Sequence, residues 1–234
     1  MNKKILHDND YDSIINVPME GVTDSMQDDG NRVRESFKND PRIKNILIPG
    51  ECLQKRIRRL AGEIADGYKQ KDIDFLVVLK GAMFFAADLS RALSEYKKNV
   101  RFHLIKTSVY SMEIKQSNDE SREVKLELAP GDLRNRDIML IEDITDQGFT
   151  MNWLMSYCTE EKKVGSLKIC TLFDKILEKP SERVIKLREK IKIHHTGFYI
   201  PDVWIAGYGV DAAEDLRNLP FVASINQDHY RKKT

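Results

Sequence analysis

Apolar residues recur along the chain at two alternating spacings, one helical and one typical of buried strands. Residues 51–71 carry large apolar side chains every three or four positions, at Leu53, Ile57, Leu60, Ile64 and Tyr68. This spacing predicts an amphipathic helix. The segment DFLVVL at 74–79 is short and rich in aliphatic residues, which is typical of a buried parallel strand.

The same alternation continues toward the end of the chain. The remaining elements are predicted to be strands at 99–110, 137–143, 166–175, 193–200 and 203–210 and helices at 81–96 and 149–163. Strands that alternate with helices form a parallel sheet covered by helices on both faces. The sequence therefore predicts an α/β fold.

Three segments fall outside this alternation. Residues 1–45 are polar with little apolar periodicity, so we expect an extended or loosely packed arm, which leaves 46–234 as a single domain. The polar stretch at 111–125 is expected to be a functional or mobile loop. The charged connection at 176–190 is expected to be helical beyond Pro180.

Composition restricts the classes of function. The 234 residues are 41% hydrophobic, which is enough for a full core. The formal net charge is +1, from 38 basic and 37 acidic residues. Such an even balance gives no overall field to hold nucleic acid or an anionic membrane, so we expect neither as a partner. Any phosphate chemistry must come from a local site.

Cysteine usage and the start of the chain indicate a compartment. Cys52, Cys158 and Cys170 form no CxxC pair, which argues against a disulfide framework or a zinc site. The first residues, MNKKILHDNDYDS, lack the apolar segment of a secretory signal. Runs such as FLVVL are far too short to span a membrane. The sequence therefore predicts a cytoplasmic protein.

The segment IMLIEDITDQGFTM at 138–151 leads a buried strand directly into three carboxylates and a glycine. Ligands bind open parallel sheets where strands end and helices begin. A helix N-terminus suits a phosphate because its N–H groups lack partners and carry partial positive charge. Gly148 permits close approach or a positive φ, and Thr150 adds a hydroxyl donor. The acids suit sugar hydroxyls or a hydrated Mg²⁺, so the segment favours a phosphorylated sugar. Taken alone, it also permits an ordinary turn in which Asp146 caps the helix.

This segment resembles the phosphoribosyl-diphosphate motif of type I phosphoribosyltransferases, apolar-E-D-x-x-D-[ST]-G-x-T. The more specific resemblance is to the hypoxanthine-guanine phosphoribosyltransferases, and it extends over roughly residues 45–226. Other matching segments are VVLKGAMFFAADL (77–89, pyrophosphate loop), KTSVYS (106–111, mobile catalytic loop), SLKICTLFDK (166–175, base-recognising lysine) and residues 196–220 (hood and metal-binding strand). The resemblance implies the type I phosphoribosyltransferase fold, with a central parallel sheet flanked by helices, a mobile catalytic loop and a small hood formed largely by the C-terminal part.

The resemblance also implies the reaction and its principal residues. Enzymes of this family join a 6-oxopurine to phosphoribosyl diphosphate and release pyrophosphate, with Mg²⁺ required. Glu142 and Asp143 would bind the ribose diol, directly or through Mg²⁺. The 5′-phosphate would lie on the turn formed by Asp146, Gln147, Gly148, Phe149 and Thr150. Asp146 would act as general base toward the purine ring, since removing a ring proton makes the attacking nitrogen more nucleophilic.

The same resemblance assigns residues to the base. Lys175 would donate to the 6-oxo group, which disfavours adenine. Trp204 would stack on the purine, where relatives more often have phenylalanine, and the backbone of Ile205 would read the other edge.

At the pyrophosphate end, Lys80, Gly81 and Arg217 would bind the leaving group, and Asp211 would hold Mg²⁺ beside it. The loop at Lys80 contains a non-proline cis peptide in the family. Structural alternatives exist for single residues: a solvated strand end for Lys175, a core position for Trp204, a helix cap for Asp211 and a surface ion pair for Arg217.

The sequence departs from the family pattern at several positions. Val109-Tyr110 replaces the usual Ser-Tyr of the mobile loop, which removes a hydroxyl donor near the pyrophosphate. Gln147 replaces a small hydroxyl residue, and Phe149 replaces lysine or a small polar residue. Residues 176–195 lengthen a connection that is short in many relatives, and we expect a surface helix or an oligomer contact there.

Two classes of function are therefore weighed. The first is a purine-salvage transferase for hypoxanthine, guanine or both, with xanthine as a variant. The second is a catalytically weak paralogue that binds nucleotide for regulation, suggested by Val109 and Gln147. Retention of Asp146, Lys175 and Asp211 favours the enzyme. Because relatives are commonly dimers or tetramers, a homodimer or homotetramer is expected.

Overall fold

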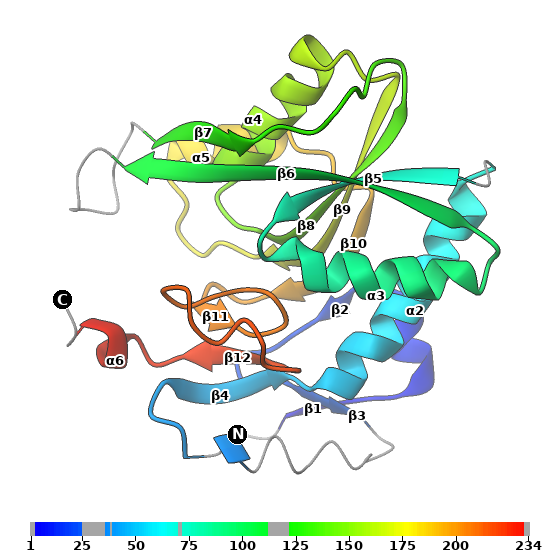
Figure 1. Ribbon diagram of the computed structural model, residues 1–234. Coiled ribbons are helices and arrows are strands. Elements are labelled where there is room, and N and C mark those ends of the chain that lie inside the picture. The colour runs from blue at the N-terminus through cyan, green and yellow to red at the C-terminus, as the bar shows by residue number, and fades with distance from the viewer. Residues whose placement is uncertain (1–2, 25–35, 38, 70–71, 112–121, 232–234) are drawn as a thin grey trace.

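The computed structural model describes residues 3–24, 36–37, 39–69, 72–111 and 122–231. Its centre is a seven-stranded sheet in the order β2-β10-β9-β8-β5-β6-β7 (Figure 1). The strands are β2 (Ile15–Asn16), β10 (His195–Ile200), β9 (Ser166–Lys175), β8 (Asp137–Thr145), β5 (Asp72–Leu79), β6 (Asn99–Ser111) and β7 (Arg122–Leu128). All neighbouring strands pair in parallel except β6 and β7, which are antiparallel. This confirms the predicted α/β class.

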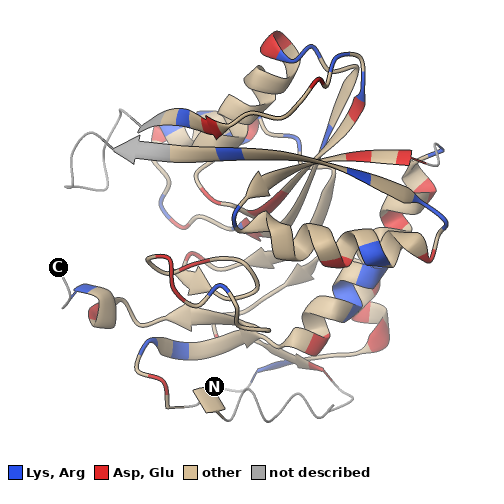
Figure 2. Cartoon of the chain, viewed as in Figure 1, with Lys and Arg blue, Asp and Glu red and all other residues tan. Residues whose placement is uncertain are grey.

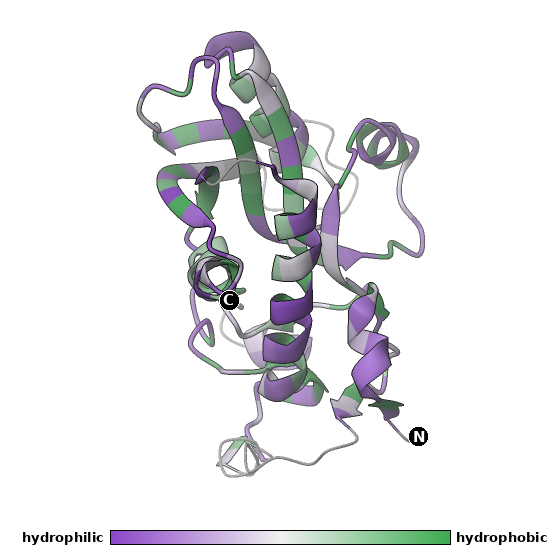
Figure 3. Ribbon diagram, turned by 90° about the vertical axis from the view of Figure 1, so that its right-hand side faces the viewer, coloured by the Kyte–Doolittle hydropathy of each residue, from purple (hydrophilic) through white to green (hydrophobic). Residues whose placement is uncertain are grey.

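Helices cover both faces of the sheet, as the alternation of elements predicts. One face carries α2 (Gly50–Gly67) and α3 (Ala82–Ser94). The other carries α4 (Phe149–Ser156), which continues as a π-helical turn (Tyr157–Glu161), and α5 (Glu182–Glu189) packs against α4. Figure 3 shows hydrophobic and hydrophilic positions mixed along the helices, as expected where each helix buries one side.

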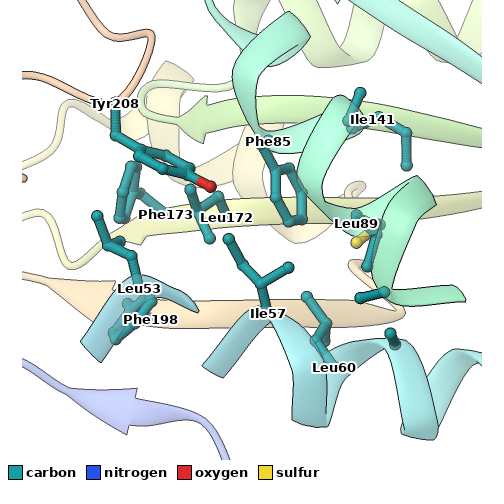
Figure 4. Close-up of a cluster of buried hydrophobic side chains, with 14 of the residues drawn as sticks. Leu53, Ile57, Leu60, Phe85, Leu89, Ile141, Leu172, Phe173, Phe198 and Tyr208 are labelled. Carbon is teal, nitrogen blue, oxygen red and sulfur yellow. The ribbon is translucent and has the colours of Figure 1, made fainter. Parts of the chain in front are cut away.

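Alternate side chains of the central strands enter different hydrophobic clusters. Phe75 and Val77 of β5 pack toward α2 and α3, whereas Leu76 and Val78 pack toward α4. A strand buried on both faces needs such a continuous apolar run. The larger cluster brings side chains of α2, α3, β8, β9 and β10 together (Figure 4). Each fully buried large side chain contributes about 1.5–3 kcal/mol through the hydrophobic effect.

A second, smaller sheet forms the hood. It joins β4 (Ile43–Ile48), β12 (Val222–Ile225) and β11 (Ile205–Ala206) in antiparallel pairs, and the short helix α6 (Gln227–Arg231) follows β12. The C-terminal part supplies two of these strands, as predicted, and β4 from the N-terminal part supplies the third. Of the run predicted at 203–210, only two residues are strand, because Gly207, Tyr208 and Gly209 all have positive φ and turn the chain.

The expectation of a loosely packed arm is wrong for residues 3–24. Strands β1 (Lys4–Leu6) and β3 (Val22–Asp24) pair in parallel, a 3₁₀ turn lies at Asp8–Asp12, and β2 joins the central sheet. The fully buried Arg56 of α2 donates to the carbonyl oxygens of Tyr11, Thr196 and Gly197, so it ties this segment to β10. Strands of two or three residues are too short to produce a periodic pattern. The domain boundary at residues 45 and 46 stays a prediction.

The loop predicted at 111–125 is strand at both ends. Strand β6 continues to Ser111 and β7 begins at Arg122, with Val109 opposite Val124 and Tyr110 opposite Glu123. The intervening residues 112–121 lie outside the described part of the chain. The stretch 106–111, expected in the mobile catalytic loop, is therefore the end of β6.

Asp74 lies near the N-terminal end of β5, among the basic side chains of Arg101, His103 and Arg136. Its carboxylate, 5% exposed, accepts two hydrogen bonds of 2.9 Å from Arg101, one of 2.9 Å from His103 and one of 3.4 Å from Arg136. The bonds from Arg101 are the main reason that the pKa of Asp74 falls to about 2. Along the chain as a whole, acidic and basic residues are interspersed (Figure 2).

We expect Asp74 to produce an acid-sensitive part of the stability. Because its pKa is lower in the folded than in the unfolded chain, its stabilisation is complete above about pH 5 and is lost as the pH falls toward 2. The free energy of unfolding in urea should therefore fall by about 2 kcal/mol over that interval. Asp74→Asn should remove this dependence, whereas Asp72→Asn, at a 43% exposed side chain, should retain it. Equal acid sensitivity in the two variants would contradict the prediction.

Candidate active site

The turn from β8 into α4 contains the acids and the glycine of the sequence motif. Ten consecutive residues, from Glu142 to Met151, line a hollow of about 260 Å³. Gly148 has φ of +89° and immediately precedes α4, where no side chain caps the helix. The alternative in which Asp146 caps the helix is therefore wrong. The first N–H groups of a helix have no partner within it, so this end of α4 suits an anion.

The three acids of the turn differ in their environment. Glu142 is 7% exposed and Asp143 is 8% exposed, whereas the side chain of Asp146 is 48% exposed. Burial raises the pKa of Glu142 well above its ordinary value, and the neighbouring Asp143 raises it further. Burial also raises the pKa of Asp143, an effect that its hydrogen bond with Glu142 and, less strongly, the positive charge of Arg217 oppose. Two buried carboxylates side by side favour any ligand that brings positive charge or hydrogen-bond donors.

The acids Glu142 and Asp143 fit the needs of Mg²⁺. Magnesium usually takes one or two protein carboxylates and keeps water or substrate oxygens as its other ligands. Within the described ranges, no group of three or more His, Cys, Asp or Glu side chains is arranged to hold a metal ion. The paired carboxylates would therefore supply two ligands to such an ion and leave its other positions to water or substrate.

The loop after β5 lies directly beside Asp143. The peptide bond between Leu79 and Lys80 is cis, as the family resemblance leads us to expect. Gly81 has ordinary right-handed helical dihedrals, with φ of −61° and ψ of −48°, so its backbone would accept any residue. However, a Cβ atom at Gly81 would overlap the Oδ2 atom of Asp143. Glycine is needed here for space.

Lys80, Asp211 and Arg217, predicted at the pyrophosphate end, come together around Glu214. Lys80 Nζ lies 2.7 Å from Glu214 Oε2, and Arg217 Nη2 lies 3.1 Å from Glu214 Oε1. Arg217 Nη2 also lies 2.8 Å from Asp211 Oδ1, and its Nη1 donates to the carbonyl oxygen of Gly209 at 2.8 Å. The ion pair that was the structural alternative for Arg217 is therefore also present. Asp211 accepts from the N–H of Glu214, but it does so within a turn, and the next described element is β12, so the alternative of a helix cap is wrong.

Lys175 lies at the C-terminal end of β9, next to the acidic turn. Its side chain is only 10% exposed, and Nζ lies 3.2 Å from Asp146 Oδ2. The two residues predicted to contact the base are therefore paired with each other. The adjacent acid, Asp174, is 8% exposed.

Trp204, the aromatic residue predicted to stack on the base, does not line the hollow beside Asp146. Trp204 packs on the hood cluster, with its ring 5.2 Å from that of Tyr230, and it lines a separate hollow of about 860 Å³. That hollow shares no residue with the one beside Asp146. Ile205 is 1% exposed on β11 and pairs with Ser224. The structure thus places both residues in the hood.

Two residues that differ from the family pattern lie in the β8–α4 turn itself. Gln147 is half-buried and lines the hollow. The ring of Phe149 faces the guanidinium of Arg183 at 5.1 Å.

Two residues of the site, Arg188 and Glu214, could not be identified from the sequence motif. Arg188, from the lengthened connection, donates to the carbonyl oxygens of Thr145 and Asp146. Glu214 joins the two cations of the pyrophosphate end. Both act through contacts between segments far apart in the sequence, which no local pattern predicts.

The family model of the phosphoribosyl transferase domain matches residues 49–212. Among curated proteins, a hypoxanthine-guanine phosphoribosyltransferase of Bacillus subtilis is 34% identical over 189 residues, covering 80% of this chain and 96% of its own. Another from Mycobacterium avium is 32% identical over 197 residues, covering 81% of this chain and 89% of its own.

Solved structures agree with this result. A hypoxanthine-guanine phosphoribosyltransferase of Bacillus anthracis has a TM-score of 0.63 and 34% identity, covering 79% of this chain and 98% of its own. The hypoxanthine phosphoribosyl transferase of Trypanosoma cruzi has a TM-score of 0.69 and 26% identity, covering 82% and 96%. Fold, motif and relatives together define a type I phosphoribosyltransferase. The chain belongs to the hypoxanthine-guanine phosphoribosyltransferase family.

The contact between Gly81 and Asp143 gives a stability prediction. Gly81→Ala should lower the free energy of unfolding in urea by about 1–3 kcal/mol, because the added methyl group displaces a buried carboxylate. Gly131→Ala is the matched control, since a Cβ there meets nothing within 4 Å, and should change stability by less than about 0.5 kcal/mol.

Combining Gly81→Ala with Asp143→Ala tests the cause. The combined variant should lose less stability than the sum of the two single changes, because the second change makes room for the added methyl group. Strictly additive losses would show that the two residues do not interfere.

Proposed function

We propose that the protein transfers the 5-phosphoribosyl group of phosphoribosyl diphosphate to hypoxanthine, guanine or both, giving IMP or GMP and pyrophosphate. The observation that carries this proposal is the hollow at the end of β8, where buried acids and a helix N-terminus occur within ten consecutive residues. The names of the relatives, hypoxanthine-guanine phosphoribosyltransferases, support the same reaction. Preference between the two bases depends on contacts with a bound purine.

In this proposal the phosphorylated sugar lies over the β8–α4 turn. The 5′-phosphate accepts hydrogen bonds from the N–H groups of residues 146–150, at the positive end of α4. The ribose diol lies on Glu142 and Asp143. Glu142 and Asp143 would hold Mg²⁺, which when bound would neutralise charge on the diphosphate. Asp211 would hold Mg²⁺ beside the pyrophosphate.

The base binds between Asp146 and Lys175. These residues pair with each other at 3.2 Å, so a purine bound between them exchanges that ion pair for its own contacts. Lys175 donates to the 6-oxo group, while Asp146 accepts the ring proton. The ring nitrogen then forms a bond to C1′ of the ribose as the bond to pyrophosphate breaks, and the proton remains on Asp146. Trp204 and the backbone of Ile205 complete the base site in this proposal, which requires the hood to present Trp204 to the purine.

Pyrophosphate leaves through contacts with Lys80, the Gly81 backbone and Arg217. Both cations are paired with Glu214 in the structure, at 2.7 and 3.1 Å. A pyrophosphate group carries more charge than one carboxylate and would displace Glu214 from this pair of cations. The proposed site therefore exchanges internal ion pairs for substrate contacts at both ends.

The second candidate, a catalytically weak nucleotide-binding paralogue, rests on Val109 and Gln147. Loss of one donor to the transition state can cost about 3–4 kcal/mol. Backbone amides of the turn are unaffected by either side chain, so this candidate predicts nucleotide binding with little turnover. The comparisons do not favour it, because the chain covers nearly the whole length of relatives named as enzymes.

Assembly and location stay predictions. We expect a homodimer or homotetramer with small-molecule substrates and a cytoplasmic location. None of the helices within the described residues is long and apolar enough to cross a membrane.

Asp146→Asn distinguishes the two candidates. With hypoxanthine or guanine, phosphoribosyl diphosphate and Mg²⁺, the native protein should form nucleotide, and this variant should be slower by about 10²–10⁴-fold because the general base is lost. Glu160→Gln, at an exposed carboxylate on the π-helical turn, should match the native rate. Tight binding of IMP by a native protein that does not turn over would favour the weak paralogue.

Lys175→Ala tests the assignment of the base. The KM for hypoxanthine or guanine should rise by about tenfold or more, because a buried donor to the 6-oxo group is lost, while the Kd for phosphoribosyl diphosphate changes little. Lys179→Ala, at an exposed residue of the same connection, is the control. Comparable losses for both substrates would assign Lys175 a role other than base recognition.

A further inference from the structure

The lengthened connection after β9 folds as α5 and packs beside the β8–α4 turn. Ser181 caps the helix by accepting a hydrogen bond from the N–H of Val184 at 3.3 Å, and Val184 is buried. The side chains of Arg188 and Ile191 lie so close to Gly148 that a Cβ there would meet them at 3.5 and 2.8 Å. Residues of the connection 176–195 therefore pack against the turn of the proposed phosphate site.

Arg188 contacts the backbone of the turn directly. Its Nη1 donates to the carbonyl oxygen of Thr145 at 3.4 Å and to that of Asp146 at 3.3 Å. Its Nη2 forms an ion pair with Asp174, whose side chain is 11% exposed. The guanidinium is thus anchored by one acid of β9 while it contacts two successive peptide groups of the turn.

These contacts fix the direction of two N–H groups. The carbonyl of Thr145 and the N–H of Asp146 belong to one planar trans peptide, so they point in opposite directions. The same holds for the carbonyl of Asp146 and the N–H of Gln147. Holding both carbonyls toward α5 therefore directs the two N–H groups away from α5. The guanidinium also places positive charge behind the turn.

Asn152 makes a second connection of the same kind. Its Nδ2 donates to the carbonyl oxygen of Gly148 at 2.9 Å and to that of Leu187 in α5 at 3.0 Å. Because the carbonyl of Gly148 shares a peptide plane with the N–H of Phe149, this contact bears on a further amide of the turn. Three carbonyls of the turn are therefore held by side chains, those of Thr145 and Asp146 by Arg188 and that of Gly148 by Asn152.

We propose that Arg188 is a positioning residue that orients the N–H groups of Asp146 and Gln147 toward the 5′-phosphate. This inference rests on the proposed function, because it assumes that the turn binds a nucleotide phosphate. It assigns the lengthened connection a role in the active site. The role concerns the backbone of the phosphate turn, since Arg188 contacts the carbonyl oxygens of Thr145 and Asp146 and not their side chains.

Paired ligands isolate the phosphate contribution. The Kd values of IMP and inosine are measured by calorimetry for the native protein, and their ratio gives the contribution of the 5′-phosphate. Arg188→Ala should weaken IMP by about tenfold and leave inosine nearly unchanged. Arg188→Lys should be intermediate, because lysine keeps the charge but cannot contact Asp174 and two carbonyls together. Lys186→Ala, at an exposed position of α5, should match the native protein.

A second variant, which removes both partners of the Arg188–Asp174 ion pair, controls for a folding defect. Arg188→Ala combined with Asp174→Asn leaves no unpaired buried charge and should show the same selective loss of IMP affinity. Equal weakening of IMP and inosine, or an unchanged IMP affinity in this double variant, would overturn the assignment of Arg188. Failure of the native protein to bind IMP better than inosine would instead overturn the proposed function.

Discussion

The left-handed turn at Gly148 is the constraint on which the rest of the site depends. A positive φ of +89° lets the chain reverse from the end of β8 into α4 within three residues. The reversal directs the first N–H groups of α4 over the same hollow that Glu142 and Asp143 enter from the strand. Donors for an anion and acceptors for hydroxyls or a cation therefore lie within one short segment. A Cβ at this position would require both a strained backbone and displacement of Ile191.

The charged side chains of the site are balanced in pairs. Lys175 pairs with Asp146 at the base end, and Lys80 and Arg217 pair with Glu214 at the other. Such pairing satisfies the charges of Lys175 and Arg217, whose side chains are only 10% and 20% exposed. The free energy of substrate binding is therefore the difference between the new contacts with substrate and the internal ion pairs that they replace. In the proposed reaction, the purine would exchange the pair at the base end, and phosphoribosyl diphosphate would exchange the pairs at the other end.

The sequence predicts correctly the elements whose residue pattern lies within a short stretch of the chain. The helix at α2, the central strands and the motif at β8 each produce their pattern within about ten to twenty residues, and all three were predicted correctly. Strands β1, β2 and β3 could not be predicted, because elements of two or three residues are specified by tertiary partners such as Arg56. The same reason hides Arg188 and Glu214, whose contacts join segments more than 40 and 130 residues apart. The position of Trp204 against Tyr230 also depends on packing within the hood.

The departures at Gln147 and Phe149 acquire a physical context once α5 is in place. A small hydroxyl residue at position 147 would hold its donor close to the turn, whereas the donor of glutamine lies at the end of a longer and more flexible side chain, which leaves the backbone amides as the main donors. Backbone amides bind well only if their direction is fixed in advance, since ordering them on binding costs free energy. The contacts of Arg188 and Asn152 with the carbonyls of the turn supply that order. The ring of Phe149 adds a packing surface for Arg183 of α5. The unusual residues of the turn and the lengthened connection therefore form one arrangement. In it, α5 fixes the direction of the backbone amides of the turn, whereas the family pattern adds the side chain of a small hydroxyl residue at position 147.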